Sequence, residues 1–184
     1  MPNIIEIHSD YVPVERITRG VMTIDSNHSH IHNGEAYSLS GSMTVVNAKV
    51  GAIKITPPAG TYVHLQVTSI STTGSTVSVS LLEDYSFTEV AESTLTPTNH
   101  NRVSSNVSPV VCKAYADITA AGGTGATTLE TTTLTGATQG QVRTGSQSSS
   151  STEWILKPGT TYLLAFSNSG AASAIVGYNL FWYE

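Results

Sequence analysis

The chain has 184 residues, of which 39% are hydrophobic and only 11% are charged, and 8 Lys and Arg against 13 Asp and Glu give a formal net charge of -5. This acidic balance offers no electrostatic footprint for phosphates, so nucleic acid is not expected as a partner. The length fits one domain, alone or with an extended arm, and allows a hydrophobic core without disulfides or metal.

The sequence lacks the features of secreted and membrane proteins. A single cysteine, Cys112, cannot form an internal disulfide, so folding in a reducing cytoplasm is allowed. The N-terminal sequence includes Glu6 and has no basic stretch before an apolar run, which argues against a signal peptide. No segment has the roughly 18 uncharged apolar residues that a membrane helix needs. We therefore expect a soluble protein without a membrane partner.

Residues 1–27 contain apolar side chains without regular alternation, together with Pro2 and Pro13. Such a segment buries too little by itself to offset the entropy lost on ordering. We expect an extended N-terminal arm over 1–27, which orders on a neighbouring molecule, and one sandwich domain over 28–184. The alternative for this segment is an ordinary edge strand that contains Ile4, Ile5 and Ile7.

The next segment holds three of the six histidines at alternate positions, His28, His30 and His32. On a strand their side chains would share a face at a spacing of about 7 Å, so one chain could not bring all three to one ion. Three copies on a threefold axis could complete an octahedral transition-metal site. Nothing in the sequence places the segment on such an axis, so we expect solvated or hydrogen-bonded histidines and no metal or other cofactor.

Alternation of apolar and polar residues with period two recurs along the rest of the chain, and helical spacing is nearly absent. Residues 62–70 and 76–83, separated by a Thr-Thr-Gly turn, are expected to form a hairpin. Residues 174–183 are the richest in β-branched and aromatic side chains, so we place them in the middle of a sheet. Further strands are predicted at 36–40, 43–50, 53–56, 110–118, 153–157 and 162–167.

Short strands without intervening helices predict an all-β fold, and we expect an antiparallel β-sandwich of the jelly-roll type. Residues 119–152 are nearly all Thr, Ser, Gly, Ala and Gln, and we expect them to form a long loop between core strands. A small hairpin at 127–135 could form the base of this loop.

The sequence contains no motif of a known catalytic site: no Gly-x-Ser-x-Gly elbow, no His-Glu-x-x-His and no phosphate-binding glycine loop. Glu83 and Asp84 are adjacent, so on a strand they would face opposite ways, and we expect them at a solvated strand end. Cys112 lies in an alternating segment and is expected to be a small core residue. We expect no enzymatic activity and no catalytic residue.

Two groups of residues are candidates for organising loops or contacting other subunits. Asn99 and Asn101 precede Arg102, one of only eight basic residues, whose guanidinium could bind loop carbonyls or a neighbouring subunit. Trp154 and Trp182, like Tyr162, Tyr178 and Tyr183, lie in apolar segments, where aromatic side chains usually belong to a core or a subunit interface. A glycan-stacking surface is the alternative for these five aromatic residues.

Six short motifs follow one another along residues 28–184. They are Ile31-His32-Asn33-Gly34 with Tyr37, Thr56-Pro57 with His64, Leu82-Glu83-Asp84, Asn99-His100-Asn101-Arg102 with Ser104, the run from Glu153 to Leu163 (Glu-Trp-Ile-Leu-Lys-Pro-Gly-Thr-Thr-Tyr-Leu), and Trp182-Tyr183-Glu184. Together they resemble a widespread group of small structural proteins of tailed bacteriophages. The chain departs from the group at Asp84, where Gly is common, and in its Thr-rich 119–152 stretch.

This resemblance implies a capsid decoration or cement protein with a jelly-roll fold that acts as a homotrimer. Its partner would be the major capsid protein on the exterior of the virion, with assembly in the host cytoplasm. Such a subunit stabilises the phage head by bridging capsomers, through interface area and through arms that order on binding. The alternative is a tail fibre or spike tip module that binds a host-surface glycan.

Overall fold

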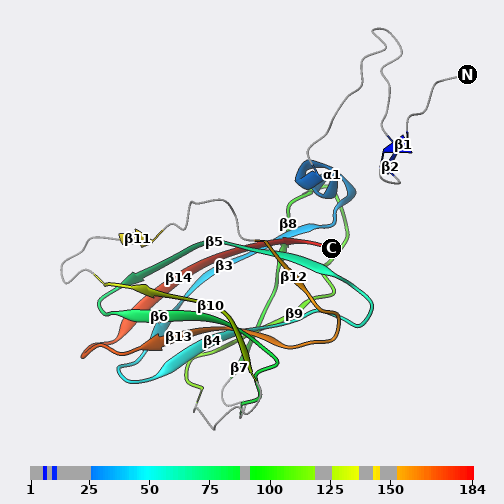
Figure 1. Ribbon diagram of the computed structural model, residues 1–184. Helices are drawn as coiled ribbons and strands as arrows, with labels where there is room; N and C mark the ends of the chain where they lie inside the picture. The colour runs from blue at the N-terminus through cyan, green and yellow to red at the C-terminus, as the bar shows by residue number, and fades with distance from the viewer. Residues whose placement is uncertain are drawn as a thin grey trace, which may run out of the picture.

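The computed structural model describes residues 6–7, 10–11, 26–87, 92–118, 126–136, 143–145 and 153–184. Two antiparallel sheets pack against each other as an open sandwich, the upper and lower layers in Figure 1. The one helix among the described residues, α1 (Ser26–Asn33), lies at one end of the sandwich, and it is not long and apolar enough to cross a membrane. The predicted all-β sandwich is therefore confirmed.

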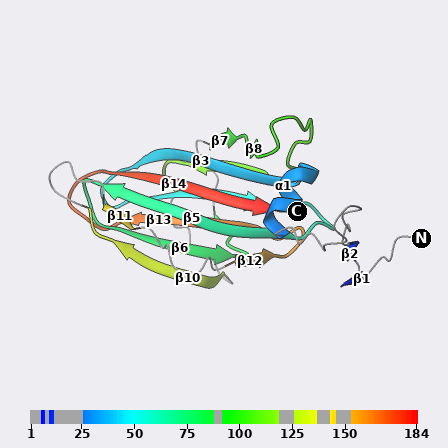
Figure 2. The same ribbon diagram turned by 90° about the horizontal axis from the view of Figure 1, so that it is seen from above.

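The upper layer, the β14 sheet, has the strand order β11-β5-β14-β3-β8, and β12 also pairs with β5. Figure 2 looks onto this layer. Its strands are β3 (Ala36–Val45), β5 (Val63–Thr73), β8 (Thr98–Asn99), β11 (Arg143–Gly145), β12 (Glu153–Leu156) and β14 (Ala174–Tyr183).

The lower layer, the β13 sheet, has the strand order β10-β6-β13-β4-β9-β7. All of its neighbouring strands are antiparallel. Its strands are β4 (Val50–Thr56), β6 (Val77–Glu83), β7 (Glu92–Leu95), β9 (Val111–Tyr115), β10 (Thr127–Leu134) and β13 (Tyr162–Asn168).

The order of pairing identifies the sandwich as a jelly roll. Strands of the first half pair with strands of the second half in reverse order: β3 with β14, β4 with β13, β5 with β12 and β11, and β6 with β10. Nested antiparallel pairs that alternate between two sheets are the defining connectivity of this fold. The short strands β7, β8 and β9 extend the edges of the two sheets.

The core between the sheets explains why the alternating segments became strands. In β14, which lies between β3 and β5 as predicted, every second residue from Ala174 to Trp182 is buried. Cys112 is 1% exposed and belongs to this core, as the sequence predicted. Burial, with a further contribution from the charge of Glu184, raises the pKa of its thiol to about 12.

The predicted hairpin of residues 62–70 and 76–83 is wrong. Both strands exist, but β5 pairs with β14 while β6 pairs with β13, so residues 74–76 carry the chain from one sheet to the other. Gly74 has φ 92°, and a Cβ on it would lie 2.7 Å from the Ser173 carbonyl oxygen, so this crossing requires glycine. Alternation reports a buried face, and strands that bury faces from opposite sheets show the same pattern as a hairpin.

Part of the expected loop at 119–152 also forms strands. Residues 127–134 are one continuous strand, β10, along the edge of β6 rather than a small hairpin, and β11 pairs with β5. Threonine favours strands because its branched side chain packs well on a pleated surface, which explains why a Thr-rich segment pairs. Residues 119–125, 137–142 and 146–152 of this stretch lie outside the described residues.

The predicted arm, 1–27, lies mostly outside the described residues. Within it, β1 (Glu6–Ile7) and β2 (Asp10–Tyr11) pair with each other in a separate two-stranded sheet. Because α1 begins at Ser26, the helix includes the last two positions of the predicted arm. The ordering of the arm on a neighbouring molecule stays a prediction.

Candidate functional site

Most of the residues that the sequence singled out lie at one end of the sandwich, here called the α1 end. There α1, the loop that follows β8 and the last residues of β14 come together (Figure 1 and Figure 2). Two arrangements make up this end: a network that fixes the C-terminus of α1, and a stack of aromatic rings beside an open pocket.

The histidines at 28, 30 and 32 lie on α1, so the expected strand is wrong. The helix ends in a Schellman motif, in which the N–H of Gly34 donates to the Ile31 carbonyl at 3.0 Å and that of Glu35 to the His30 carbonyl at 2.9 Å. Gly34 has φ 74°, which glycine adopts without a steric penalty. The Asn-Gly pair after the histidines was the available signal for a helix end.

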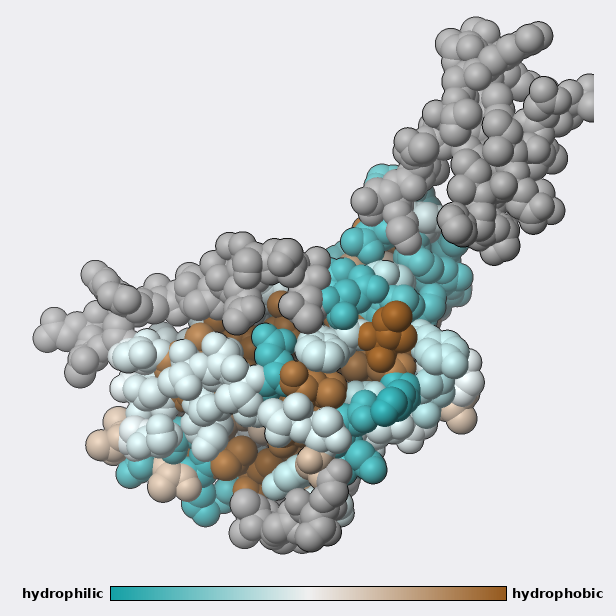
Figure 3. All heavy atoms as spheres, in the orientation of Figure 1, coloured by the Kyte–Doolittle hydropathy of each residue, from teal (hydrophilic) through white to brown (hydrophobic). Residues whose placement is uncertain are grey.

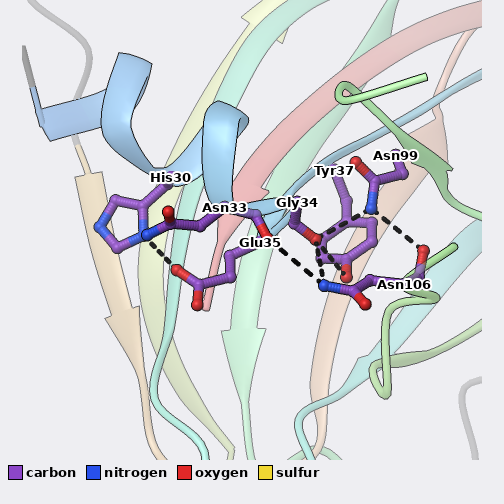
Figure 4. A network of polar contacts seen from close by, with 7 residues as sticks. All are labelled: His30, Asn33, Gly34, Glu35, Tyr37, Asn99 and Asn106. Carbon is purple, nitrogen blue, oxygen red and sulfur yellow. Dashed lines mark hydrogen bonds and ion pairs between the residues drawn. The ribbon is translucent and has the colours of Figure 1, made fainter. Parts of the chain in front are cut away.

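Asparagine side chains bind the carbonyl groups at the end of α1 (Figure 4). The Nδ2 atom of Asn99 donates to the Gly34 carbonyl at 2.9 Å. That of Asn101, which Figure 4 does not draw, donates to the His32 carbonyl at 2.8 Å. The hydroxyl of Tyr37 also donates to the Gly34 carbonyl, at 3.0 Å. These bonds satisfy helix-end carbonyls that have no partner within the helix. Asn99 and Asn101, both candidates from the sequence, therefore hold the helix in place.

The same side chains fix the backbone of the asparagine loop, defined here as residues 99–108. Asn99 Oδ1 accepts from the Asn101 N–H at 2.8 Å, and Asn101 Oδ1 accepts from the Val103 N–H at 3.1 Å. Val103 and Val107 on this loop are 96% and 84% exposed. The loop therefore presents two apolar side chains from a backbone that is already ordered.

Arg102 lies on the asparagine loop, but the structure does not place its guanidinium on loop carbonyls. The residue is exposed, and no hydrogen bond or ion pair joins its side chain to another described residue. The asparagines perform the bonding that the sequence suggested for Arg102. A contact of Arg102 with a neighbouring subunit stays a prediction.

The two tryptophans have different surroundings. Trp182 is 1% exposed, so its ring belongs to the core and is not available to a subunit interface. Its indole N–H donates to Glu184 Oε1 at 3.0 Å and lies 3.3 Å from Ser108 Oγ, at the end of the asparagine loop. Trp154, on β12, is half-buried, and its indole N–H reaches Glu130 Oε2 on β10 at 3.4 Å, so it links the two sheets.

A stack of three rings joins α1 to the β14 sheet. The ring of Tyr183 lies between His30, at a centroid distance of 4.4 Å, and His64 of β5, at 4.6 Å. Each imidazole also has a carboxylate partner: Nδ1 of His30 is 3.1 Å from Glu35 Oε2, and Nδ1 of His64 is 2.6 Å from Glu153 Oε1. The stack is therefore held in place from both sides.

Glu153 is the most densely bonded group of this stack. Its carboxylate accepts bonds from the Tyr183 hydroxyl at 2.9 Å and from Gln66 Nε2 at 3.1 Å, in addition to its contact with His64. Burial alone would raise the pKa of Glu153, but the bonds from His64, Gln66 and Tyr183 outweigh burial and hold it below its ordinary value. This cluster leaves no signal in the sequence, because only the β5–β12 register brings Glu153 beside His64.

An open pocket of about 450 Å³ lies beside the ring stack. Tyr62 at the pocket is 63% exposed, an unusual exposure for an aromatic side chain. The pocket offers imidazole, hydroxyl and carboxylate groups to a polar ligand. Its lining residues are His30, Gly60, Thr61, Tyr62, His64, Tyr183 and Glu184.

Glu83, expected at a solvated strand end, is bonded instead. Its carboxylate lies 2.7 Å from Lys157 Nζ and accepts from the Tyr162 hydroxyl at 2.9 Å. The bond from Lys157 is the main cause that lowers the pKa of Glu83, against an opposing effect of burial. Asp84, the next residue, is exposed. The two carboxylates therefore have separate surroundings and do not form an acid/base pair.

Comparisons of the chain with protein-family models, with curated proteins and with solved structures find no match. Among the described residues, no group of three or more His, Cys, Asp or Glu side chains could hold a metal ion.

Proposed function

We propose that this chain is a structural subunit of a virion, a capsid decoration protein. It assembles as a homotrimer on the exterior of the phage head and bridges capsomers of the major capsid protein. The motifs that resemble phage structural proteins suggest this role, and a jelly roll is one of the folds of viral capsid domains. A fold alone does not determine a function, so the support for this role comes from the surface of the sandwich.

The observation that carries the proposal is the charge-free central part of the outer face of the β14 sheet, which the charged Glu153 flanks on the neighbouring strand β12. Its three long strands, β3, β5 and β14, have 10, 11 and 10 residues, and none of these is Asp, Glu, Lys or Arg. Freely solvated surfaces normally mix both signs of charge, whereas the centres of protein interfaces are depleted in charge. The exposed side chains on this face include Ser40, Ser42, Thr44, Thr68 and Asn179.

The β13 sheet differs from this face. Its outer side is covered by a second apolar cluster, in which Ala52, Leu163 and Ala165 pack with Tyr115 and Ile118. Its strands carry charged residues, among them Lys54, Glu83, Glu92, Lys113 and Glu130. Figure 3, in the orientation of Figure 1, views the sandwich from the side and shows hydrophilic, neutral and apolar side chains together at the edge between the two layers. Contact with other subunits is therefore favoured on the β14 sheet.

The asparagine loop supports the same function. Val103 and Val107 are exposed on a backbone that the side chains of Asn99 and Asn101 already order. Docking through such a loop costs little conformational entropy, because the loop is ordered before it binds. A subunit that acts through contact area alone benefits from this kind of rigid apolar projection.

The test places a charge in the centre of the uncharged face. Ser42→Lys and Asn179→Lys should prevent trimer formation in light scattering and reduce cosedimentation with heads that lack the protein, because a buried unpaired ammonium is costly. Ser93→Lys, on the exposed edge strand β7, is the matched control and should assemble as the wild type does. If both face variants still form trimers and bind heads, this face is not the interface.

The pocket at the α1 end favours a second function, a tail fibre or spike tip that binds a glycan. Tyr62 could stack on a sugar ring, and Glu184 and Thr61 could accept or donate hydrogen bonds to its hydroxyls. In that case Tyr62→Ala should abolish binding to a glycan array while the fold remains intact. Absence of any glycan bound by the wild type would leave the decoration function as the better account.

A further inference from the structure

Two histidines on α1 lie in a geometry that the sequence did not suggest. The Nε2 atom of His28 is 2.8 Å from the Nε2 atom of His32, and the two ring centroids are 4.6 Å apart with an interplanar angle of 51°. Residues four apart on a helix lie one above the other on the same face. His28 and His32 are both exposed, whereas His30 is directed to Glu35 and Tyr183.

We propose that His28 and His32 form a bidentate binding site for a divalent transition metal, with Cu²⁺ or Ni²⁺ as the best match. On a strand the alternate histidines would have been too far apart for one ion. The helix removes this obstacle for one pair, because it brings two ring nitrogens within the span of a single metal. Histidines at positions i and i+4 on one helix face are a general arrangement for chelation.

The distance between the nitrogens indicates the geometry of the ion. With metal–nitrogen bonds of about 2.1 Å, an N···N separation of 2.8 Å corresponds to an angle of about 84° at the metal, near a right angle. With the same bond lengths, a tetrahedral ion would need the nitrogens about 3.4 Å apart. Right angles between ligands belong to square-planar and octahedral sites, which suit Cu²⁺ and Ni²⁺ better than Zn²⁺. Water would occupy the remaining positions.

Binding requires one proton to move but releases none. In the structure without metal, the short N···N contact needs a proton on one of the two Nε2 atoms. When the ion binds, that proton passes to Nδ1 of the same ring through water, so both imidazoles stay neutral and both Nε2 lone pairs face the metal.

Two features favour binding of a cation at this site. The C-terminal end of α1, including the backbone of His32, is fixed by the bond from Asn101 and by the Schellman motif. The net charge of -5 makes the approach of a cation favourable. The ligands are therefore supplied by a helix whose end is held before the ion binds.

The test is a titration of the full chain with CuCl₂, and separately with NiCl₂, in a buffer that does not bind metals. We expect one Cu²⁺ per chain, with electron paramagnetic resonance showing nitrogen ligands. His28→Gln and His32→Gln should each weaken binding by at least about tenfold, because the second imidazole of a chelate binds at high effective concentration. His100→Gln, which changes an exposed histidine outside α1, is the matched control and should bind as the wild type does.

Circular dichroism of each variant establishes that loss of binding is not loss of folding. In the wild type, excess Ni²⁺ should raise the melting temperature, and this shift should be absent in both α1 variants. Unchanged Cu²⁺ binding in His28→Gln and His32→Gln would overturn the proposal, as would one ion per three chains, which would indicate a site shared between copies.

Discussion

Gly34 lies directly against Ser104, so that a Cβ on Gly34 would be 2.3 Å from the Ser104 hydroxyl oxygen. Two separate requirements for glycine therefore coincide at the end of α1: a φ of 74° and the close approach of the asparagine loop. The motif residues near position 34 and those near position 104, distant in sequence, form one structural unit.

Gly34→Ala should reduce the free energy of unfolding by more than the backbone penalty of about 1–2 kcal/mol, because the new methyl group also displaces Ser104. Gly159→Ala is the matched control: its φ is 70°, but a Cβ there meets nothing within 4 Å. Urea denaturation of both variants isolates the effect of the close contact. Equal losses of unfolding free energy in the two variants would show that Ser104 moves aside without an energetic cost.

Asn99→Ala should destabilise the protein by about 1–3 kcal/mol, because the substitution leaves the buried Gly34 carbonyl with fewer donors and the Asn101 N–H without its acceptor. Ser93→Ala, at an exposed position of the edge strand β7, should change stability by no more than about 0.5 kcal/mol. Thermal unfolding of the two variants measures this difference in stability. A neutral Asn99→Ala would mean that Tyr37 and Asn106 suffice to bind the helix end.

Glu153 should make stability depend on pH in the acidic range. Since the folded protein holds the pKa of Glu153 below its ordinary value of 4.5, the ionised group adds stability above that value. This contribution is lost as the pH falls through the lowered pKa of the folded state. The difference in unfolding free energy between the wild type and Glu153→Gln should therefore be largest above pH 4.5 and shrink below it. A difference that grows on acidification would contradict the bonding described for Glu153.

The N-terminal segment should contribute more to docking than to folding. A chain that begins at Ser26 keeps α1 and the whole sandwich, so its melting temperature should stay within a few degrees of that of the full chain. Its cosedimentation with phage heads should be weaker. Failure of the shortened chain to fold would show that the segment is part of the core.

The sequence predicted the strands better than their partners. Alternation located β5, β6 and β14, because each buries one face, but it could not show that β5 and β6 lie in opposite sheets. Pairing depends on connections that a local pattern does not contain. The place of β14 was predicted because a central strand is richer in β-branched and aromatic residues than an edge strand.

The candidate site was predicted only in part, again because contacts between distant segments leave no local pattern. Asn99 and Asn101 stood out as turn-forming residues near Arg102, yet their partner, the end of α1, could not be known without the helix. The alternating histidines matched the pattern of a strand, so the sequence did not predict that helix. His64 and Glu153 meet only through the register of β5 and β12, which no local signal reveals.

The number of copies of this chain in a purified virion tests the proposed function most directly. Quantitative mass spectrometry of intact particles, with the major capsid protein as internal standard, gives this number. A decoration protein on the capsid lattice should be present in hundreds of copies per particle, in fixed proportion to the major capsid protein. A few to tens of copies, or their recovery with isolated tails instead of heads, would contradict the decoration function and favour the fibre or spike tip.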